Sequence, residues 1–192
     1  MIEEIKLETF PQLQTRNLIL RRLVPPDAEA VFRIFADAAV TQYYDLETFT
    51  TLEQASQLIQ RQTDRFEQQA GVRWGIALPG DNIIIGSCGY VFDKPHAQAG
   101  LGYELSQAFW RRGFMTEALE AILRFGFETL ALNRIQALVM LDNKASVQLL
   151  HKLGFQEEGI LRESKFFKGQ FHDLRCFSLL KKEYRGNTKT TA

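Results

Sequence analysis

The stretch FWRRGFMTEALEAILRFGF, Phe109–Phe127, joins two arginines and a glycine to the start of an amphipathic segment. Its apolar residues recur at helical spacing, which predicts a helix from about Phe114 with one buried face. The first turn of a helix leaves about four backbone N–H groups unpaired and carries partial positive charge. Arg111 and Arg112 add full charges, and Gly113 lets an anion approach the backbone closely. The stretch therefore predicts a phosphate or pyrophosphate site, with a solvated surface turn as the alternative.

The composition is that of an ordinary globular protein without a charge bias. The 192 residues are 45% hydrophobic and 24% charged, which suits one domain with a real core. Because 23 Lys and Arg residues balance 23 Asp and Glu residues, we expect no direct binding of nucleic acid or of an anionic membrane. We expect residues 1–184 to form a single domain and residues 185–192 to form a polar, flexible tail.

The lack of a recognisable targeting signal and the use of cysteine favour a cytoplasmic location. The N-terminal run MIEEIKLETF is acidic and has no long apolar segment, so we expect no signal peptide. No stretch approaches the ~18 consecutive apolar residues that indicate a membrane-spanning helix. Cys88 and Cys176 lie in apolar, strand-like runs, and buried free thiols fit a reducing compartment.

Apolar periodicity and turn residues predict how strands and helices follow one another. The expected strands cover residues 17–23, 72–78, 83–92, 101–105, 134–141, 155–162 and 172–180. The expected helices cover about residues 26–37, 50–69, 114–130 and 143–153, and the second opens with the capping-box spacing of Thr50 and Glu53. This order predicts an α/β (α+β) domain with a mixed, mostly antiparallel twisted sheet of about six to seven strands and about four helices.

Two motifs carry a resemblance to a known family. The run LSQAFWRRGFM, residues 105–115, resembles the acyl-CoA signature of the GNAT superfamily of N-acetyltransferases, Gln/Arg-x-x-Gly-x-Gly/Ala after a strand. Trp110 takes the first position, Gly113 the glycine, and Met115 replaces the small residue while keeping its backbone N–H. The run DNKASVQLLHKLGF, residues 142–155, is similar to a motif of the RimJ/RimL branch, the ribosomal-protein N-terminal acetyltransferases. With the flanking strands, the resemblance covers nearly the whole chain.

The resemblance implies a GNAT-like fold that binds acetyl-CoA as co-substrate. The fourth and fifth expected strands would splay apart, and the pantetheine arm would lie beside Glu104, Leu105 and Ser106 on the exposed strand edge. The N–H of Leu105 would then stabilise the oxyanion that forms from the thioester. The residues implied to bind the pyrophosphate and adenosine phosphates are Arg111, Arg112, Gly113, Phe114, Met115 and Thr116, with Lys144 and Lys152 as weaker candidates.

The resemblance also suggests catalytic groups, each with a structural alternative. Glu104 is the candidate base, directly or through water, and the alternative is a strand carboxylate paired with an arginine. Many GNAT enzymes place a tyrosine after the fifth strand to protonate the thiolate, but Leu150 occupies that position here. Ser146 could hydrogen-bond the sulfur, and Asn143 of the same motif is a further residue implied to bind the cofactor. For both, helix capping is the alternative.

The implied reaction is direct attack of a primary amine on acetyl-CoA in a ternary complex. Branch resemblance favours a protein N-terminal α-amine as acceptor. A small amine, such as an antibiotic, polyamine or amino acid, and a non-catalytic CoA-binding module remain alternatives. Family relatives also make a homodimer possible. We expect no metal site, because the three histidines (His96, His151 and His172) suit solvated or structural roles.

Overall fold

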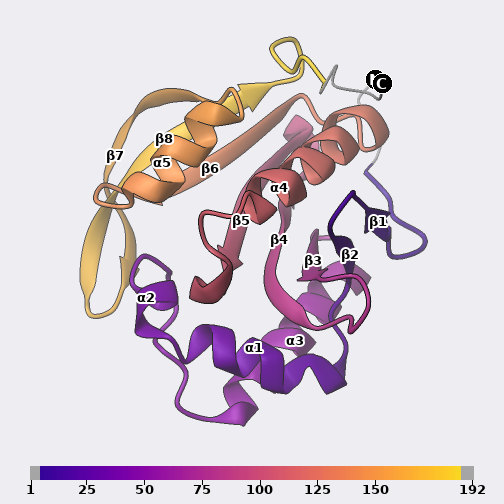
Figure 1. Ribbon diagram of the computed structural model, residues 1–192. Coiled ribbons are helices and arrows are strands. Elements are labelled where there is room, and N and C mark those ends of the chain that lie inside the picture. The colour runs from indigo at the N-terminus through magenta and orange to yellow at the C-terminus, as the bar shows by residue number, and fades with distance from the viewer. Residues whose placement is uncertain (1–4, 187–192) are drawn as a thin grey trace.

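The structure, a computed structural model, describes residues 5–186; residues 1–4 and 187–192, which include most of the expected tail, lie outside the described part. One sheet of eight strands is ordered β1-β2-β3-β4-β5-β6-β8-β7 (Figure 1). The strands are β1 (Leu13–Gln14), β2 (Ile19–Arg22), β3 (Gly71–Ala77), β4 (Ile84–Asp93), β5 (Gln98–Leu105), β6 (Arg134–Met140), β7 (Gln156–Phe167) and β8 (Gln170–Leu180). The α-helices of the described residues are α1 (Ala28–Phe35), α2 (Ala38–Thr41), α3 (Leu52–Glu67), α4 (Phe114–Arg124) and α5 (Lys144–Lys152).

The predicted fold class is confirmed, and the corrections concern short or shifted elements. The eighth strand is the two-residue β1, and the fifth helix is the four-residue α2. Neither is long enough to produce a periodic pattern. The capping box of α3 uses Thr51 and Gln54 in place of Thr50 and Glu53, and the Thr51 N–H donates to Gln54 Oε1 at 3.0 Å. The helix expected to run to about residue 130 ends at Arg124 and continues as a π-helical turn, Phe125–Thr129.

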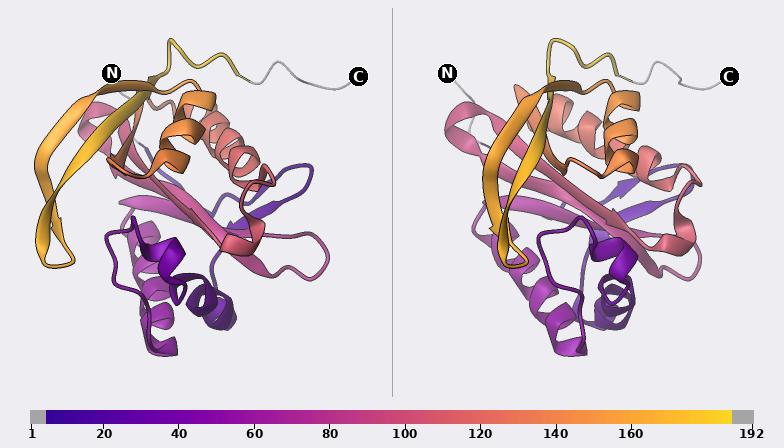
Figure 2. Two further views of the ribbon diagram at one scale, coloured as in Figure 1. Left: turned by 60° about the vertical axis from the view of Figure 1, so that its left-hand side comes forward. Right: turned by 90° about the vertical axis from the view of Figure 1, so that its left-hand side faces the viewer.

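The helices cover the sheet on both faces, with α1, α2 and α3 on one side and α4 and α5 on the other (Figure 2). The first group packs around a smaller apolar cluster that includes Val31, Ile34 and Ile59. The β7–β8 hairpin extends past the body of the sheet.

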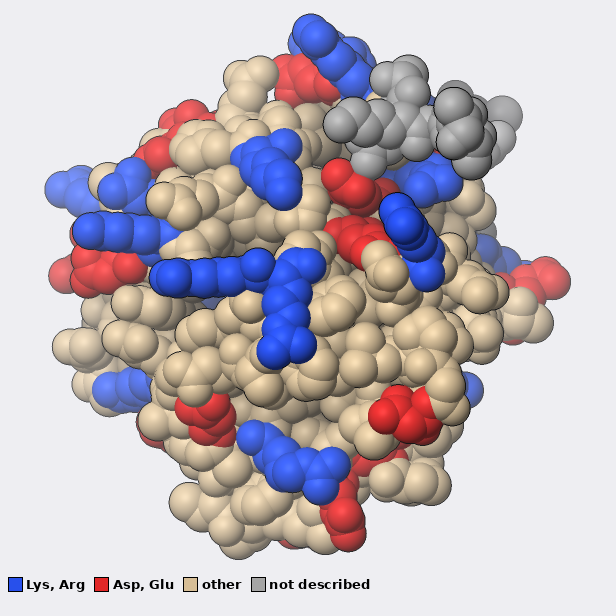
Figure 3. Space-filling model, viewed as in Figure 1, with Lys and Arg blue, Asp and Glu red and all other residues tan. Residues whose placement is uncertain are grey.

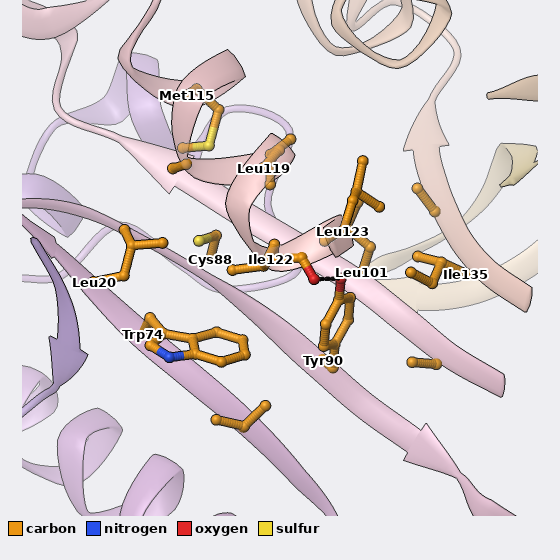
Figure 4. Packing of buried hydrophobic residues seen from close by; sticks show 14 of the residues in the cluster. Leu20, Trp74, Cys88, Tyr90, Leu101, Met115, Leu119, Ile122, Leu123 and Ile135 are labelled. Carbon is orange, nitrogen blue, oxygen red and sulfur yellow. Dashed lines mark hydrogen bonds between the residues drawn. The ribbon is translucent and has the colours of Figure 1, made fainter. Parts of the chain in front are cut away.

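Helix α4 is fixed to the sheet by its apolar stripe. Leu119, Ile122 and Leu123 are buried against Trp74 and Tyr90 of the sheet (Figure 4). The Tyr90 hydroxyl donates a 2.7 Å hydrogen bond to the Ile122 carbonyl oxygen, which ties the middle of the helix to β4. The N-terminus of α4 is thereby held in a fixed position above the sheet.

The expected splay lies between β5 and β6, the only parallel neighbours among the described strands. Their pairing is limited to Gln98, Ala99 and Gly100 against residues 134–136. The other strand pairs are antiparallel, and β6 keeps its pairing with β8 up to Met140. The second half of β5, from Leu101 to Leu105, therefore has no strand partner on its β6 side.

No helix within residues 5–186 combines the length and the apolar character that crossing a membrane requires. Cys88 and Cys176 are free and buried, as predicted.

Candidate functional site

The unpaired edge of β5 is defined by the alternation of backbone groups along the strand. The Ser106 N–H donates to the Ile85 carbonyl oxygen at 2.8 Å, so Ser106 faces β4. Because backbone groups alternate between the two sides of a strand, Glu104 also faces β4, whereas Tyr103 and Leu105 face the gap toward β6. This supports the expected position of the Leu105 N–H. It also corrects the expectation that the backbone of Glu104 and Ser106 lies on the free edge.

Trp110 fixes the end of that edge. Its indole Nε1 donates a 2.7 Å hydrogen bond to the Leu105 carbonyl oxygen, so the first residue of the signature is bound to the last residue of β5. The carbonyl is thereby satisfied, and the Leu105 N–H is left as the hydrogen-bonding group of that residue toward the gap.

The N-terminus of α4 has a set of unpaired amides. The cap residue Gly113 has a φ of 83°, in the left-handed region, and provides no side-chain cap. From Arg112 to Thr116, no amide donates a hydrogen bond within the described residues. Glu117 N–H is the first to do so, to the Gly113 carbonyl at 3.0 Å. A Cβ added at Gly113 would meet no described heavy atom within 4 Å, so the space in front of the helix is open.

Side chains near this helix end point away from the amides. Met115 is buried in the core (Figure 4), and Phe114 packs against Phe109 with ring centroids 6.1 Å apart. The first-turn acid Glu117 accepts hydrogen bonds from the N–H and side chain of Asn17, at 2.7 and 2.9 Å. No carboxylate of the described chain therefore occupies the anion site.

Two arginines carry positive charge at the same helix end. Arg111 and Arg112 are exposed and form no ion pair with any described residue. The Arg112 guanidinium lies over the Phe109 ring, 5.5 Å from its centroid. Lys144 and Lys152 are exposed at the two ends of α5, and Lys152 lines a pocket with Glu120 and Leu123 of the second half of α4, away from the helix start. Figure 3 shows Lys and Arg side chains across the middle of the face that carries α4 and α5.

The start of α5 brings the second motif to the gap. Asn143 caps the helix, because its side-chain oxygen accepts from the Ser146 N–H at 3.1 Å. This is the capping role that was the alternative for Asn143. The Ser146 hydroxyl has no part in the cap and lies beside Tyr103 of β5. Leu150 is fully buried in the core, so the helix offers no polar group there.

Glu104 lies on the opposite face of the sheet, toward α1 and α3. Its carboxylate forms an ion pair with Arg73 and accepts hydrogen bonds from Ser87 and, at 3.2 Å, from the Tyr44 hydroxyl. Gly102 leaves room for the guanidinium, because a Cβ there would lie 3.0 Å from Arg73 Nη1. The structure thus has the arginine pairing that was the alternative to a catalytic base.

Burial and neighbouring charges shift the pKa values of two side chains in this cluster, Arg73 and Tyr44. Burial alone would lower the pKa of Arg73, but the neighbouring Glu104 carboxylate and Tyr44 raise that pKa above its ordinary value. Burial also raises the pKa of the Tyr44 phenol. A small pocket beside Glu104, Arg73 and Ser87 has a volume of about 10 Å³, which is close to the room that one water molecule requires.

The site therefore combines three features that a single extended acyl-CoA could contact. These are the amides and arginines at α4, the free edge of β5, and the gap between β5 and β6, with Ser146 and Glu104 on opposite faces of the sheet. The sequence indicated these three features, but it did not indicate Tyr103 or Arg73 as residues of the site. Within residues 5–186, no group of three or more His, Cys, Asp and Glu side chains is placed to hold a metal ion.

Comparisons with known proteins give one family. Residues 17–156 match the family model of the acetyltransferase (GNAT) domain. YoaA, an uncharacterized N-acetyltransferase of Bacillus subtilis (strain 168), is 40% identical over 173 residues, 90% of this chain and 98% of that protein. The [ribosomal protein uS5]-alanine N-acetyltransferase of Escherichia coli (strain K12) is 34% identical over 110 residues, 56% of each chain. The crystal structure of a GNAT-family acetyltransferase from Bacillus anthracis is 22% identical and has the same fold, with a TM-score of 0.80 over 90% of this chain and 100% of that one.

Proposed function

Because the chain belongs to the GNAT acetyltransferase family, we propose that it transfers the acetyl group of acetyl-CoA to the N-terminal α-amine of a protein or peptide. The amine attacks the thioester directly in a ternary complex. The chemistry needs a neutral amine, donors for the tetrahedral oxyanion, and stabilisation of the thiolate that leaves.

The proposed acetyl-CoA site uses the unpaired groups around α4 and β5. The pyrophosphate would be bound by the amides from Arg112 to Thr116, an arrangement typical of anion sites at helix N-termini. Arg111 and Arg112 would contact the adenosine phosphates. The pantetheine arm would pair with Tyr103 and Leu105 as an added strand, because their backbone groups face the gap.

The Leu105 N–H is the proposed oxyanion donor. It lies at the end of β5 where the strand has no partner, and Trp110 holds the same residue through its carbonyl. A donor that is fixed before the reaction stabilises developing charge without reorganisation.

The α-amine is favoured because Glu104 is a poorly available base. Its carboxylate already accepts from Arg73, Ser87 and Tyr44, and the small pocket beside it has room for about one water. We propose that Glu104 accepts the amine proton through such a water. An α-amine, with a pKa of ~7.7–8.0, is partly neutral at pH 7, whereas a lysine, with a pKa of ~10.4, would need a much stronger base.

The name of the Escherichia coli relative supports the same acceptor class, since that protein is named for acetylating an alanine of ribosomal protein uS5. A ribosomal protein is therefore the first acceptor to test. The buried free thiols Cys88 and Cys176 fit action in the cytoplasm. A homodimer stays a prediction that size-exclusion chromatography with light scattering will test.

The experiment is a thiol-release assay with acetyl-CoA and a panel of acceptors. One peptide carries a free N-terminus and an internal lysine, a second has its N-terminus blocked, and polyamines, amino acids and aminoglycosides complete the panel. We expect acetylation of the free N-terminus alone, located by mass spectrometry. Turnover on small amines alone would show that the acceptor is a small-molecule amine. Binding of acetyl-CoA without turnover on any acceptor would indicate a non-catalytic module.

Binding of CoA by itself tests the donor site. We expect the triple variant Arg111→Glu, Arg112→Glu and Gly113→Val to weaken CoA binding at least about 10-fold, because it removes charge-assisted contacts. Arg33→Glu, an exposed substitution on α1, is the matched charge reversal and should leave CoA binding unchanged. Equal affinities for the two variants would rule out the proposed site.

A further inference from the structure

The Tyr103 hydroxyl is a buried polar group without a partner. It is one of two buried side-chain atoms, with Arg175 Nε, that make no hydrogen bond to any described residue. Buried polar groups are nearly always hydrogen-bonded, so an unpaired one calls for an explanation such as a missing ligand. Neither the motifs nor the family match assigns it a role.

Its position is the gap between β5 and β6. Tyr103 lies on the same strand edge as Leu105, two residues away, and its ring packs against the core on the face of α4 and α5. Glu104, the next residue, points to the opposite face, since side chains alternate along a strand. Two neighbouring residues thus point to opposite faces of the sheet.

Ser146 shares this location. Burial raises the pKa of Tyr103 to about 12, and the Ser146 hydroxyl, which lies close to the phenol without meeting hydrogen-bond geometry, partly lowers it. No charged side chain of the described chain contributes to that shift. Since Asn143 accepts from the Ser146 backbone N–H, the Ser146 hydroxyl stays free for another contact.

We propose that the Tyr103 hydroxyl, with Ser146 beside it, donates a hydrogen bond to the sulfur of CoA and stabilises the thiolate that leaves during acetyl transfer. The inference rests on the proposed placement of the pantetheine arm along β5. Tyr103 would then stabilise the thiolate from the strand, whereas Leu150, at the helix position, has no polar group that could contact it.

The proton balance makes Tyr103 a hydrogen-bond donor and not an acid. The amine nitrogen attacks the carbonyl carbon, the C–N bond forms, the C–S bond breaks, and the electron pair leaves on sulfur. The amine proton passes to the Glu104 carboxylate through the water proposed beside it. A free thiol has a pKa of ~8.5, so its thiolate is too weak a base to remove the proton of a phenol whose pKa is about 12. The phenol therefore stays neutral, and the thiolate takes a proton from solvent after release.

The test measures the bound thiol directly. The pKa of the CoA thiol is followed by the ultraviolet absorbance of its thiolate in complex with the wild type, Tyr103→Phe and Tyr184→Phe. We expect the pKa of the bound thiol to rise by about 1–2 in Tyr103→Phe, and the rate of acetyl transfer to fall roughly 10- to 100-fold. Tyr184, which stacks on Phe127 with centroids 4.8 Å apart, is the matched control and should behave as wild type.

Desulfo-CoA distinguishes a contact with sulfur from a change in the pocket. Its affinity should be equal for the wild type and Tyr103→Phe. An unchanged thiol pKa in Tyr103→Phe, or an equal loss of CoA and desulfo-CoA affinity, overturns the inference. Failure of the wild type to bind CoA at all refutes the proposed donor site instead. Should Tyr103→Phe not fold, replacement of Tyr103 by 3-fluorotyrosine, a stronger donor, must lower the pKa of the bound thiol, and no change overturns the inference.

Discussion

The Trp110 indole Nε1 donates a 2.7 Å hydrogen bond to the Leu105 carbonyl oxygen, so the loop that leads into α4 holds the end of β5 in place. The two parts of the proposed acetyl-CoA site, the amides of α4 and the free edge of β5, are thus joined by one side chain. Any change at Trp110 should affect the position of the Leu105 N–H.

Trp110→Phe should reduce acetyl transfer more than it reduces stability. The variant loses one hydrogen bond at a residue that is 41% exposed, so we expect the free energy of unfolding to fall by about 0.5–1.5 kcal/mol. A mobile Leu105 N–H should lower kcat by roughly 10-fold, part of the effect of losing an oxyanion donor. Urea denaturation and steady-state kinetics measure the two quantities.

Trp74→Phe is the matched control for Trp110. Its indole also donates to a backbone carbonyl, that of Pro11, but it lies fully buried in the core away from the gap. It should cost stability while leaving kcat of the folded protein unchanged. If the two variants lost kcat to the same degree, the Trp110 contact would have no special role.

Arg111 combines a charge with an unfavourable backbone conformation. Its φ is 58°, in the left-handed region, where a side chain costs roughly 1 kcal/mol. Arg111→Gly and Arg111→Ala remove the same charge, but only glycine relieves the strain. We expect both to weaken CoA binding equally, by about 10-fold, and the glycine variant to be more stable than the alanine variant by about 1 kcal/mol. Calorimetric titration and urea denaturation test this, and an alanine variant as stable as glycine would contradict it.

Sequence patterns were sufficient for the long elements of the fold. The helix beginning at Phe114 and the strands on either side of it have enough turns or alternations to show a period. The two-residue β1 and the four-residue α2 do not, and only contacts with the rest of the chain fix them. The cap of α3 lies one residue later than predicted, because the Gln54 side chain accepts from the Thr51 N–H in the way that a glutamate would.

The candidate site was predicted where it depends on local sequence. The unpaired amides after Gly113 follow from helix geometry alone. Which residues of β5 face the gap depends instead on the register with β4, so Tyr103 could not be recognised in advance. The ion pair between Arg73 and Glu104 joins residues on β3 and β5 and depends on the same registers.

The pH dependence of stability should include a contribution from Glu158 on β7. Its carboxylate accepts from Arg134 of β6 and Ser178 of β8, and these hydrogen bonds hold its pKa at about 2, below the ordinary value of 4.5. A pKa that is lower in the folded state adds stability that is present above pH 4.5 and is lost as the pH falls toward 2. Because Glu158 is 42% exposed, we expect about 1 kcal/mol or less.

Urea denaturation at neutral and acidic pH measures this contribution. Glu158→Gln should lower the free energy of unfolding at neutral pH and should lose less stability than wild type on acidification. Glu8→Gln, at a side chain that is 82% exposed, should keep the wild-type dependence. An unchanged acid response in Glu158→Gln would show that the hydrogen bonds to Arg134 and Ser178 do not affect stability.

Variants of the Arg73–Glu104 ion pair can separate the contribution of Glu104 to stability from a role in proton transfer. Glu104→Gln leaves a buried guanidinium without its carboxylate and should cost about 3–5 kcal/mol, whereas the double variant Arg73→Met, Glu104→Leu should fold nearly as well as wild type. If Glu104 accepts the amine proton through water, the double variant should lose up to about 10²-fold in kcat/KM at pH 7. That loss should shrink above pH ~8, where an α-amine is already neutral. A deficit that does not change with pH would assign Glu104 to structure alone and leave solvent as the proton acceptor.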